Sequence, residues 1–155
     1  MLSINISGTE IKNFMNKLLK TDCFDRFDIR SFELETFISY TINGMLNNDY
    51  LEEEKEKKKQ YCSWTEVRPY IFGLIKGKIK PKCIKAVFSL NTKETLEICD
   101  NAAAMFLNVI FQEDNIYCTT ATAQKNFSLE KKEDYIWEEY IKTFFKEKEI
   151  YYTVK

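Results

Sequence analysis

Residues 104–122, AMFLNVIFQEDNIYCTTAT, hold the clearest hairpin pattern in this chain and decide which fold we expect. Two segments rich in apolar, β-branched and aromatic residues, 104–112 and 115–122, are separated only by Glu113 and Asp114. Such segments joined by two residues are typical of antiparallel strands connected by a tight turn. The pattern therefore predicts an antiparallel hairpin, and residues 124–129 are a candidate third strand.

A similar pattern occurs earlier in the chain, where residues 26–34 and 37–46 predict a second hairpin that ends near Asn43-Gly44. Alternating apolar residues predict two further strands, and apolar residues at helical spacing predict helices between the strands. The added strands are expected at 2–7 and 83–90, and the helices at about 9–20, 63–76 and 131–148. Residues 93–99 could form either a short helix or a strand.

The predicted elements run in the order strand, helix, hairpin, helix, and then in the same order again. Long antiparallel hairpins with helices between them imply an α+β fold whose helices pack on one face of a curved, mainly antiparallel sheet. The two halves, residues 1–77 and 82–150, could be an internal repeat within one domain, with a charged loop at 52–60. Sliding clamps and TATA-binding protein join two halves in a comparable order, but this analogy carries no function.

Composition excludes several functional classes. The chain has no histidine, which excludes Ser-His-Asp and Cys-His catalytic systems and zinc sites that use imidazole. The chain has five cysteines, an odd number, and none of them form a Cys-x-x-Cys pair. This pattern is typical of reduced thiols in a cytosol. We therefore expect a cytoplasmic protein without a metal, a cofactor, a signal peptide or a membrane span. The formal charge of −1, from 23 basic and 24 acidic side chains, argues against a dedicated nucleic-acid-binding domain.

Residues 63–80, SWTEVRPYIFGLIKGKIK, read first as an architectural helix. The segment begins with capping-box spacing and ends with lysines and a glycine, which suit the C-terminus of a helix. Its apolar face is expected to pack beneath the sheet through Trp64, Ile71 and Leu74.

The alternative interpretation of this segment is a ligand surface. An aromatic ring can stack on a base, lysines can follow phosphates, and an arginine offers a planar fork to a carboxylate or phosphate. The arginine at position 68 stands out because the chain has twenty lysines and three arginines, although it could also pair internally with Glu66 or with an acid from the hairpins. The candidate binding residues are Trp64, Arg68, Lys76, Lys78, Lys80 and Lys82, and Lys85 extends the patch.

A catalytic interpretation needs paired acids or an activated thiol. Paired acids can perform acid–base chemistry when burial separates their pKa values, although pairs on a strand more often mark a wet sheet face. The thiols would need a lysine or a helix N-terminus to lower their pKa, and most such cysteines are buried apolar residues. The candidates are Asp25 with Asp28, Glu33 with Glu35, Glu138 with Glu139, and the thiols of Cys62 and Cys118.

Four segments together resemble a known family. They read EIKNFMNKLL (10–19), FDRFDIRSFELETFISYTINGML (24–46), WTEVRPYIFGLIKGK (64–78) and MFLNVIFQEDNIYCTTATAQKNFSL (105–129). With the Trp-bearing terminal helix, they resemble an uncharacterised clostridial family that is known only as a domain of unknown function. The resemblance covers nearly the whole chain and implies a stand-alone bacterial domain, without an activity, cofactor or partner.

These observations favour a non-enzymatic binding or adaptor protein of the bacterial cytoplasm, whose partner is another protein or a second copy of itself. The first alternative is a nucleic-acid-binding protein that uses the sheet and the lysines of residues 76–85. The second alternative is a small enzyme with a site around Arg68.

Overall fold

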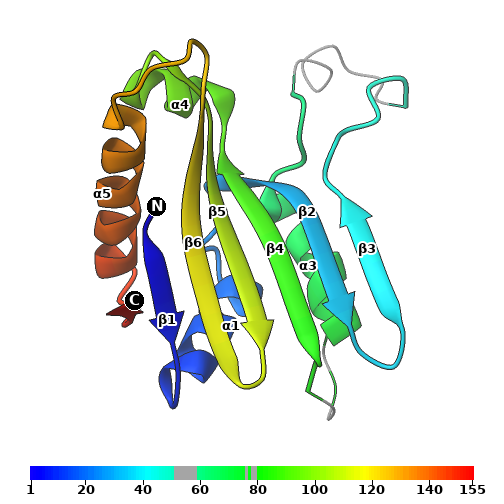
Figure 1. Cartoon of the computed structure of the whole chain (residues 1–155). Coiled ribbons are helices and arrows are strands. Elements are labelled where there is room, and N and C mark those ends of the chain that lie inside the picture. The colour runs from blue at the N-terminus through cyan, green and yellow to red at the C-terminus, as the bar shows by residue number, and fades with distance from the viewer. Residues whose placement is uncertain (51–58, 76, 78–79) are drawn as a thin grey trace.

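An antiparallel sheet forms the frame of the protein in a computed structural model that describes residues 1–50, 59–75, 77 and 80–155 (Figure 1). In this part of the chain the sheet has seven strands in the order β3-β2-β4-β5-β6-β1-β7, and every neighbouring pair is antiparallel. The strands are β1 (Ser3–Ile6), β2 (Phe27–Glu35), β3 (Ser39–Asn43), β4 (Cys83–Leu90), β5 (Ala102–Gln112), β6 (Asn115–Gln124) and β7 (Thr153–Val154). The expected α+β class and both predicted hairpins are confirmed.

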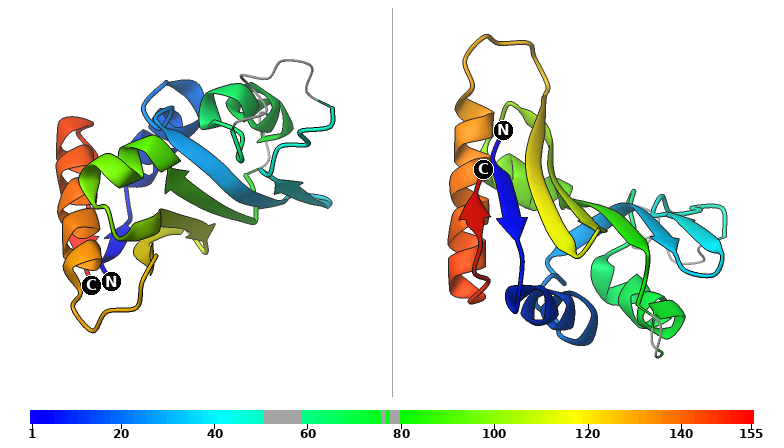
Figure 2. Two further views of the ribbon diagram at one scale, coloured as in Figure 1. Left: turned by 90° about the horizontal axis from the view of Figure 1, so that it is seen from above. Right: turned by 60° about the horizontal axis from the view of Figure 1, so that its bottom comes forward.

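Helices pack on one face of this curved sheet, and no helix of the described residues lies on the other face (Figures 1 and 2). The described helices are α1 (Glu10–Lys20), α3 (Trp64–Ile75), α4 (Thr92–Ile98) and α5 (Lys132–Glu147). The ambiguous segment after β4 is therefore a helix, because the Asn91 side chain accepts a hydrogen bond from the Glu94 backbone N–H at 2.9 Å and caps it.

The turn between β5 and β6 follows the rule that led to its prediction. Gln112 pairs with Asn115, and Glu113 and Asp114 between them have φ of 51° and 57°. Left-handed conformations at both central residues make a turn whose twist matches that of the flanking strands.

The structure corrects the predicted strand at 124–129. β6 ends at Gln124, and the next residues are held outside the ladder by Asn101. The Lys125 N–H donates to the Asn101 carbonyl at 2.8 Å, and the Asn101 side chain donates to the Asn126 carbonyl at 3.1 Å. Strand β7, which pairs with β1 at one edge of the sheet, was not predicted from the sequence.

The two halves occupy different places in the sheet although their elements occur in the same order. β4 pairs with β5 of its own half, whereas β1 pairs with β6 of the other half. β1 therefore lies at the opposite end of the sheet from the β2–β3 hairpin.

The side chains on the helix side of the sheet form one core rich in aromatic rings. Trp64 and Ile71 of α3 are fully buried, as expected for an architectural helix, but Leu74 is 37% exposed and does not belong to this core. The Trp64 ring lies 5.1 Å from that of Phe88 on β4, and its N–H donates to the Leu18 carbonyl at 3.0 Å. Trp64 thus joins α3 to both the sheet and α1.

Replacing Trp64 by alanine should lower the free energy of unfolding by about 3–5 kcal/mol, because it removes a buried ring and leaves a cavity and an unpaired carbonyl. Tyr70→Ala on the same helix is the control: its side chain is 77% exposed, and the change should stay within about 0.5 kcal/mol. Urea denaturation of both variants measures this difference. Equal effects would contradict the placement of Trp64 in the core.

Candidate functional site

A polar cleft of about 650 Å³ opens at the end of the sheet where β2 begins and β4 ends. We call it the polar cleft, and among its lining residues are Asp25, Asp28, Arg30, Tyr61, Asn91 and Glu94. Three separate segments meet there: the start of β2, the chain just before α3, and the connection from β4 to α4. Concave sites with converging polar groups from several elements are where small ligands usually bind.

Backbone pairing brings the segment before α3 against β2. Asp28 forms a bridge with Ser63, and the Ile29 N–H donates to the Cys62 carbonyl at 2.9 Å. Asp28 and Arg30 are two residues apart on β2, so ordinary alternation directs both to the face away from the core. Two opposite charges therefore line the cleft.

Asp28 is the most perturbed acid of the cleft. Burial raises its pKa from 3.8 to about 6, against the opposing influence of the Lys59 and Arg30 charges. Within the described residues, no hydrogen bond to its carboxylate is formed. A partly dehydrated carboxylate without a hydrogen-bond donor is destabilising, and a ligand that supplies the donor would relieve that effect.

Arg30 is held rigidly beside it. Its guanidinium carbon lies 3.8 Å from the centre of the Tyr61 ring and 5.1 Å from that of Phe106. Its Nε–H donates to the hydroxyl of the buried Ser89 at 3.0 Å. Two aromatic rings and one hydrogen bond thus fix the plane of a cation that lines the cleft.

Arg68 forms a two-pronged ion pair with Asp25 at the rim of the cleft. Its Nε and Nη2 donate to the two carboxylate oxygens at 3.1 and 3.0 Å, and both side chains are largely buried. Of the internal partners that the sequence suggested, Glu66 instead accepts from Lys59 and Ser63 at the start of α3. Arg68 therefore contributes to the cleft through Asp25.

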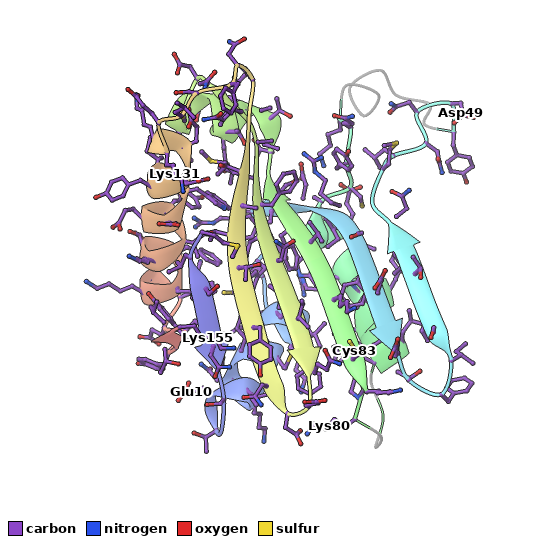
Figure 3. The ribbon with its side chains drawn as sticks, viewed as in Figure 1. Glu10, Asp49, Lys80, Cys83, Lys131 and Lys155 are labelled. Carbon is purple, nitrogen blue, oxygen red and sulfur yellow. The ribbon has the colours of Figure 1, made fainter. Side chains whose placement is uncertain are left out.

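The remaining predicted binding residues lie elsewhere. Trp64 is fully buried, so the stacking role proposed for it is wrong. Lys80, near the opposite end of β4 from the cleft, pairs with Asp114 (Figure 3). Lys82 is exposed just before β4. Lys76 and Lys78 lie outside the described residues.

The candidate nucleophiles and the other acid pair on the sheet do not assemble a site. Burial raises the pKa of the Cys62 thiol and, more strongly, that of the fully buried Cys118, which disfavours a reactive thiolate. Glu33 and Glu35 are exposed on the outer sheet face, as expected for a wet face. The described residues contain no group of acids and cysteines arranged to hold a metal ion, and no described helix is long and apolar enough to cross a membrane.

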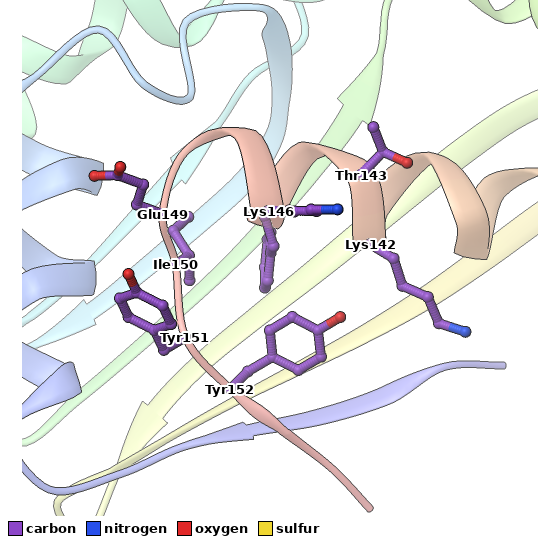
Figure 4. Close-up of a pocket in the computed structure, with 8 residues that line it drawn as sticks. Lys142, Thr143, Lys146, Glu149, Ile150, Tyr151 and Tyr152 are labelled. Carbon is purple, nitrogen blue, oxygen red and sulfur yellow. The ribbon is translucent and has the colours of Figure 1, made fainter.

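A second hollow of about 610 Å³ lies between the last turns of α5 and the segment that leads to β7 (Figure 4). Its lining residues all come from one stretch, residues 142–152. Lys142 forms an ion pair with Glu139, and the ring centres of Tyr152 and Phe145 lie 5.5 Å apart. Because no distant segments converge there, the polar cleft is the stronger candidate.

The sequence contained part of the signal for the polar cleft. Asp25 and Asp28 were a candidate acid pair, and Arg68 stood out because arginine is rare in the chain. The other two arginines, Arg26 and Arg30, also line the cleft. All three arginines of a lysine-rich chain therefore lie around one site. The spacing of residues gave no indication that Arg30 and Tyr61 belong to it.

Comparison with known proteins adds a family but no activity. The model of a family of unknown function, DUF5721, matches residues 17–153. No curated protein and no solved structure matches the chain.

Asp28→Asn should stabilise the protein at neutral pH. Because the folded pKa of about 6 lies above the unfolded value of 3.8, the ionised carboxylate disfavours folding above about pH 6 and has no effect below about pH 4. The variant should therefore gain about 1–2 kcal/mol at about pH 7.5, allowing for partial contact with water, and nothing near pH 4.

Urea denaturation of both proteins across this pH range measures the difference. Glu33→Gln, which removes an exposed acid from the same sheet face, is the control and should show no such pH dependence. A destabilised Asp28→Asn protein at neutral pH would show that the carboxylate is satisfied in the fold.

The pair of Arg68 and Asp25 should couple in a double-mutant cycle. Two charge-assisted hydrogen bonds in a partly buried setting predict a coupling of about 1–2 kcal/mol, above the range of exposed pairs. Urea denaturation of Arg68→Ala, Asp25→Ala and the double variant provides the value. A coupling near zero would leave Arg68 free for an external partner.

Proposed function

The chain belongs to the DUF5721 family, and we propose that this protein is a non-enzymatic binding protein whose polar cleft takes up a small zwitterionic ligand. The ligand class is a free amino acid or short peptide that carries an ammonium and a carboxylate. The observation that supports the proposal is that one cleft holds both a rigid Arg30 and an Asp28 carboxylate that receives no hydrogen bond from the described residues.

The surroundings of Asp28 suit the ammonium group of such a ligand. The carboxylate is partly dehydrated and receives no hydrogen bond from the described residues, so a ligand that donates N–H bonds would gain both charge attraction and hydrogen bonding. A bound cation would also lower the pKa of Asp28 and release any proton that it holds.

The surroundings of Arg30 suit the carboxylate of the ligand. Nε–H is used by Ser89, while the rings of Tyr61 and Phe106 lie against the guanidinium and fix its plane. No described residue accepts a hydrogen bond from the terminal nitrogens, which can donate to an anion in the plane, the geometry that suits a carboxylate. A cation held this way loses little side-chain freedom on binding.

The dimensions of the cleft agree with this class. A volume of about 650 Å³ falls within the usual range for small-molecule sites. The Asn91 side chain caps α4, and the Asp25 carboxylate accepts hydrogen bonds from Arg68. We therefore assign these two residues to the walls of the cleft. We assign Asp28 and Arg30 as the recognition groups.

A titration of labelled protein with dipeptides and free amino acids, followed by NMR, should shift the amide signals of residues around Asp28, Arg30 and Tyr61. Asp28→Asn should weaken binding roughly ten- to a hundredfold through loss of a charged hydrogen bond. N-acetylation of the dipeptide should weaken binding to the wild type similarly but have little further effect on the variant.

Lys85→Gln, on the same sheet face outside the cleft, is the matched control and should bind as the wild type does. No shifts with any zwitterion, or equal affinities in Asp28→Asn, would refute this ligand class. Hydrolysis of the bound dipeptide that depends on Asp28 would favour the enzyme alternative.

The enzyme alternative has one observation in its favour. Asp28 has a raised pKa of about 6, and Asp25 beside it is engaged by the Arg68 fork, so the two acids of the pair have different environments. The nucleic-acid alternative remains a prediction. It depends on residues 76–85, where Lys80 is engaged by Asp114.

A further inference from the structure

We propose that strand β3 pairs with β3 of a second copy of this chain, so that the two sheets join edge to edge. β3 is the last strand on one side of the sheet, and no strand of the described part pairs with its outer side (Figure 1). Exposed edges of this kind are templates for pairing with another strand.

The backbone of β3 directs hydrogen-bonding N–H and C=O groups to its outer side. The Gly44 N–H donates to the Arg30 carbonyl on β2, and the Thr36 N–H donates to the Ile38 carbonyl in the turn, both at 2.9 Å. Because bonding alternates along an antiparallel ladder, Tyr40 and Ile42 also bond to β2. The N–H and C=O groups of Ser39, Thr41 and Asn43 are therefore directed outward.

The edge lacks the features that normally block such pairing. β3 reads SYTIN and contains no charge and no proline. The opposite edge of the sheet is different: β7 has two residues and is followed by Lys155, whose ammonium lies over the Tyr117 ring. Short, charged edges resist association, and uncharged ones do not.

One antiparallel register makes β3 complementary to itself. With Thr41 facing Thr41 of the second copy, Ser39 lies opposite Asn43, and Tyr40 lies opposite Ile42. Thr–Thr and aromatic–β-branched pairs are favourable across strands, and no like charges meet. The outward-facing groups also fall opposite one another, so each such pair can exchange two hydrogen bonds.

The same register brings exposed apolar side chains together at both ends. Phe37, which is 88% exposed, would lie beside Met45 of the second copy, which is 52% exposed. Contacts between a methionine sulfur and an aromatic ring are favourable. Tyr40 and Ile42 pack against the core on the helix side, so pairing would continue that apolar row across the junction.

A second copy is therefore the occupant that this edge fits. A junction of one short strand buries less surface than a permanent dimer does, so the dimer should be reversible. Sedimentation velocity over a wide concentration range should show the average mass rising toward twice that of the monomer. Hydrogen exchange at the amides of Ser39, Thr41 and Asn43 should slow over the same range.

Two variants test the edge itself. Thr41→Lys places like charges opposite each other, and Thr41→Pro removes an outward N–H without touching a bond to β2; each should weaken dimerisation at least about tenfold. Thr153→Lys, on the opposite edge strand, is the matched control and should dimerise as the wild type does. Circular dichroism confirms that each variant is folded.

Three results would overturn the proposal. The first is a monomer at every concentration. The second is a dimer that both Thr41 variants form as well as the wild type, which would place the interface elsewhere. The third is exchange at Thr41 that stays constant while the mass doubles.

Discussion

The ring of Phe24 touches rings from four parts of the fold, and the arrangement of the helices depends on this junction. From the connection before β2, it lies 5.5 Å from Phe14 of α1, 6.1 Å from Phe27 of β2, 5.6 Å from Phe88 of β4 and 5.3 Å from Phe144 of α5. It is fully buried. Because α1 and α5 meet the sheet through one side chain, both must lie on the same face, and the described part of the chain places no helix on the other face (Figure 2).

β2 links this core to the polar cleft. Phe27 and Ile29 point into the core, and the pleat directs Asp28 to the opposite face. Arg30 follows two residues after Asp28 and therefore points to that face as well. The proposed recognition groups thus stand on a strand whose other side is fixed by buried aromatic rings, which keeps their geometry rigid.

Local rules predicted most of the frame and little of the cleft. Both hairpins and the main helices were predicted because alternation, helical spacing and turn residues are properties of short segments. The end of β6 was missed because Asn101, distant in sequence, holds residues 125 and 126 outside the ladder. Of the cleft, the sequence indicated only the acid pair Asp25 and Asp28 and the isolated Arg68, since its shape depends on backbone pairing across more than thirty residues. Spacing cannot reveal such contacts.

The setting of the charges makes the cleft a better candidate for a recognition site than the lysine-rich end of the sheet. Lys80 and Asp114 are 62% and 72% exposed, so water and salt screen their interaction and its loss changes little. Arg68 and Asp25 are only 20% and 17% exposed, and burial already raises the pKa of neighbouring Asp28. Charges interact more strongly where water is excluded. A ligand charge of the right sign is therefore worth more in the cleft than at the other end, and one of the wrong sign is penalised more. The cleft can discriminate between ligands by charge, which an exposed lysine patch does weakly.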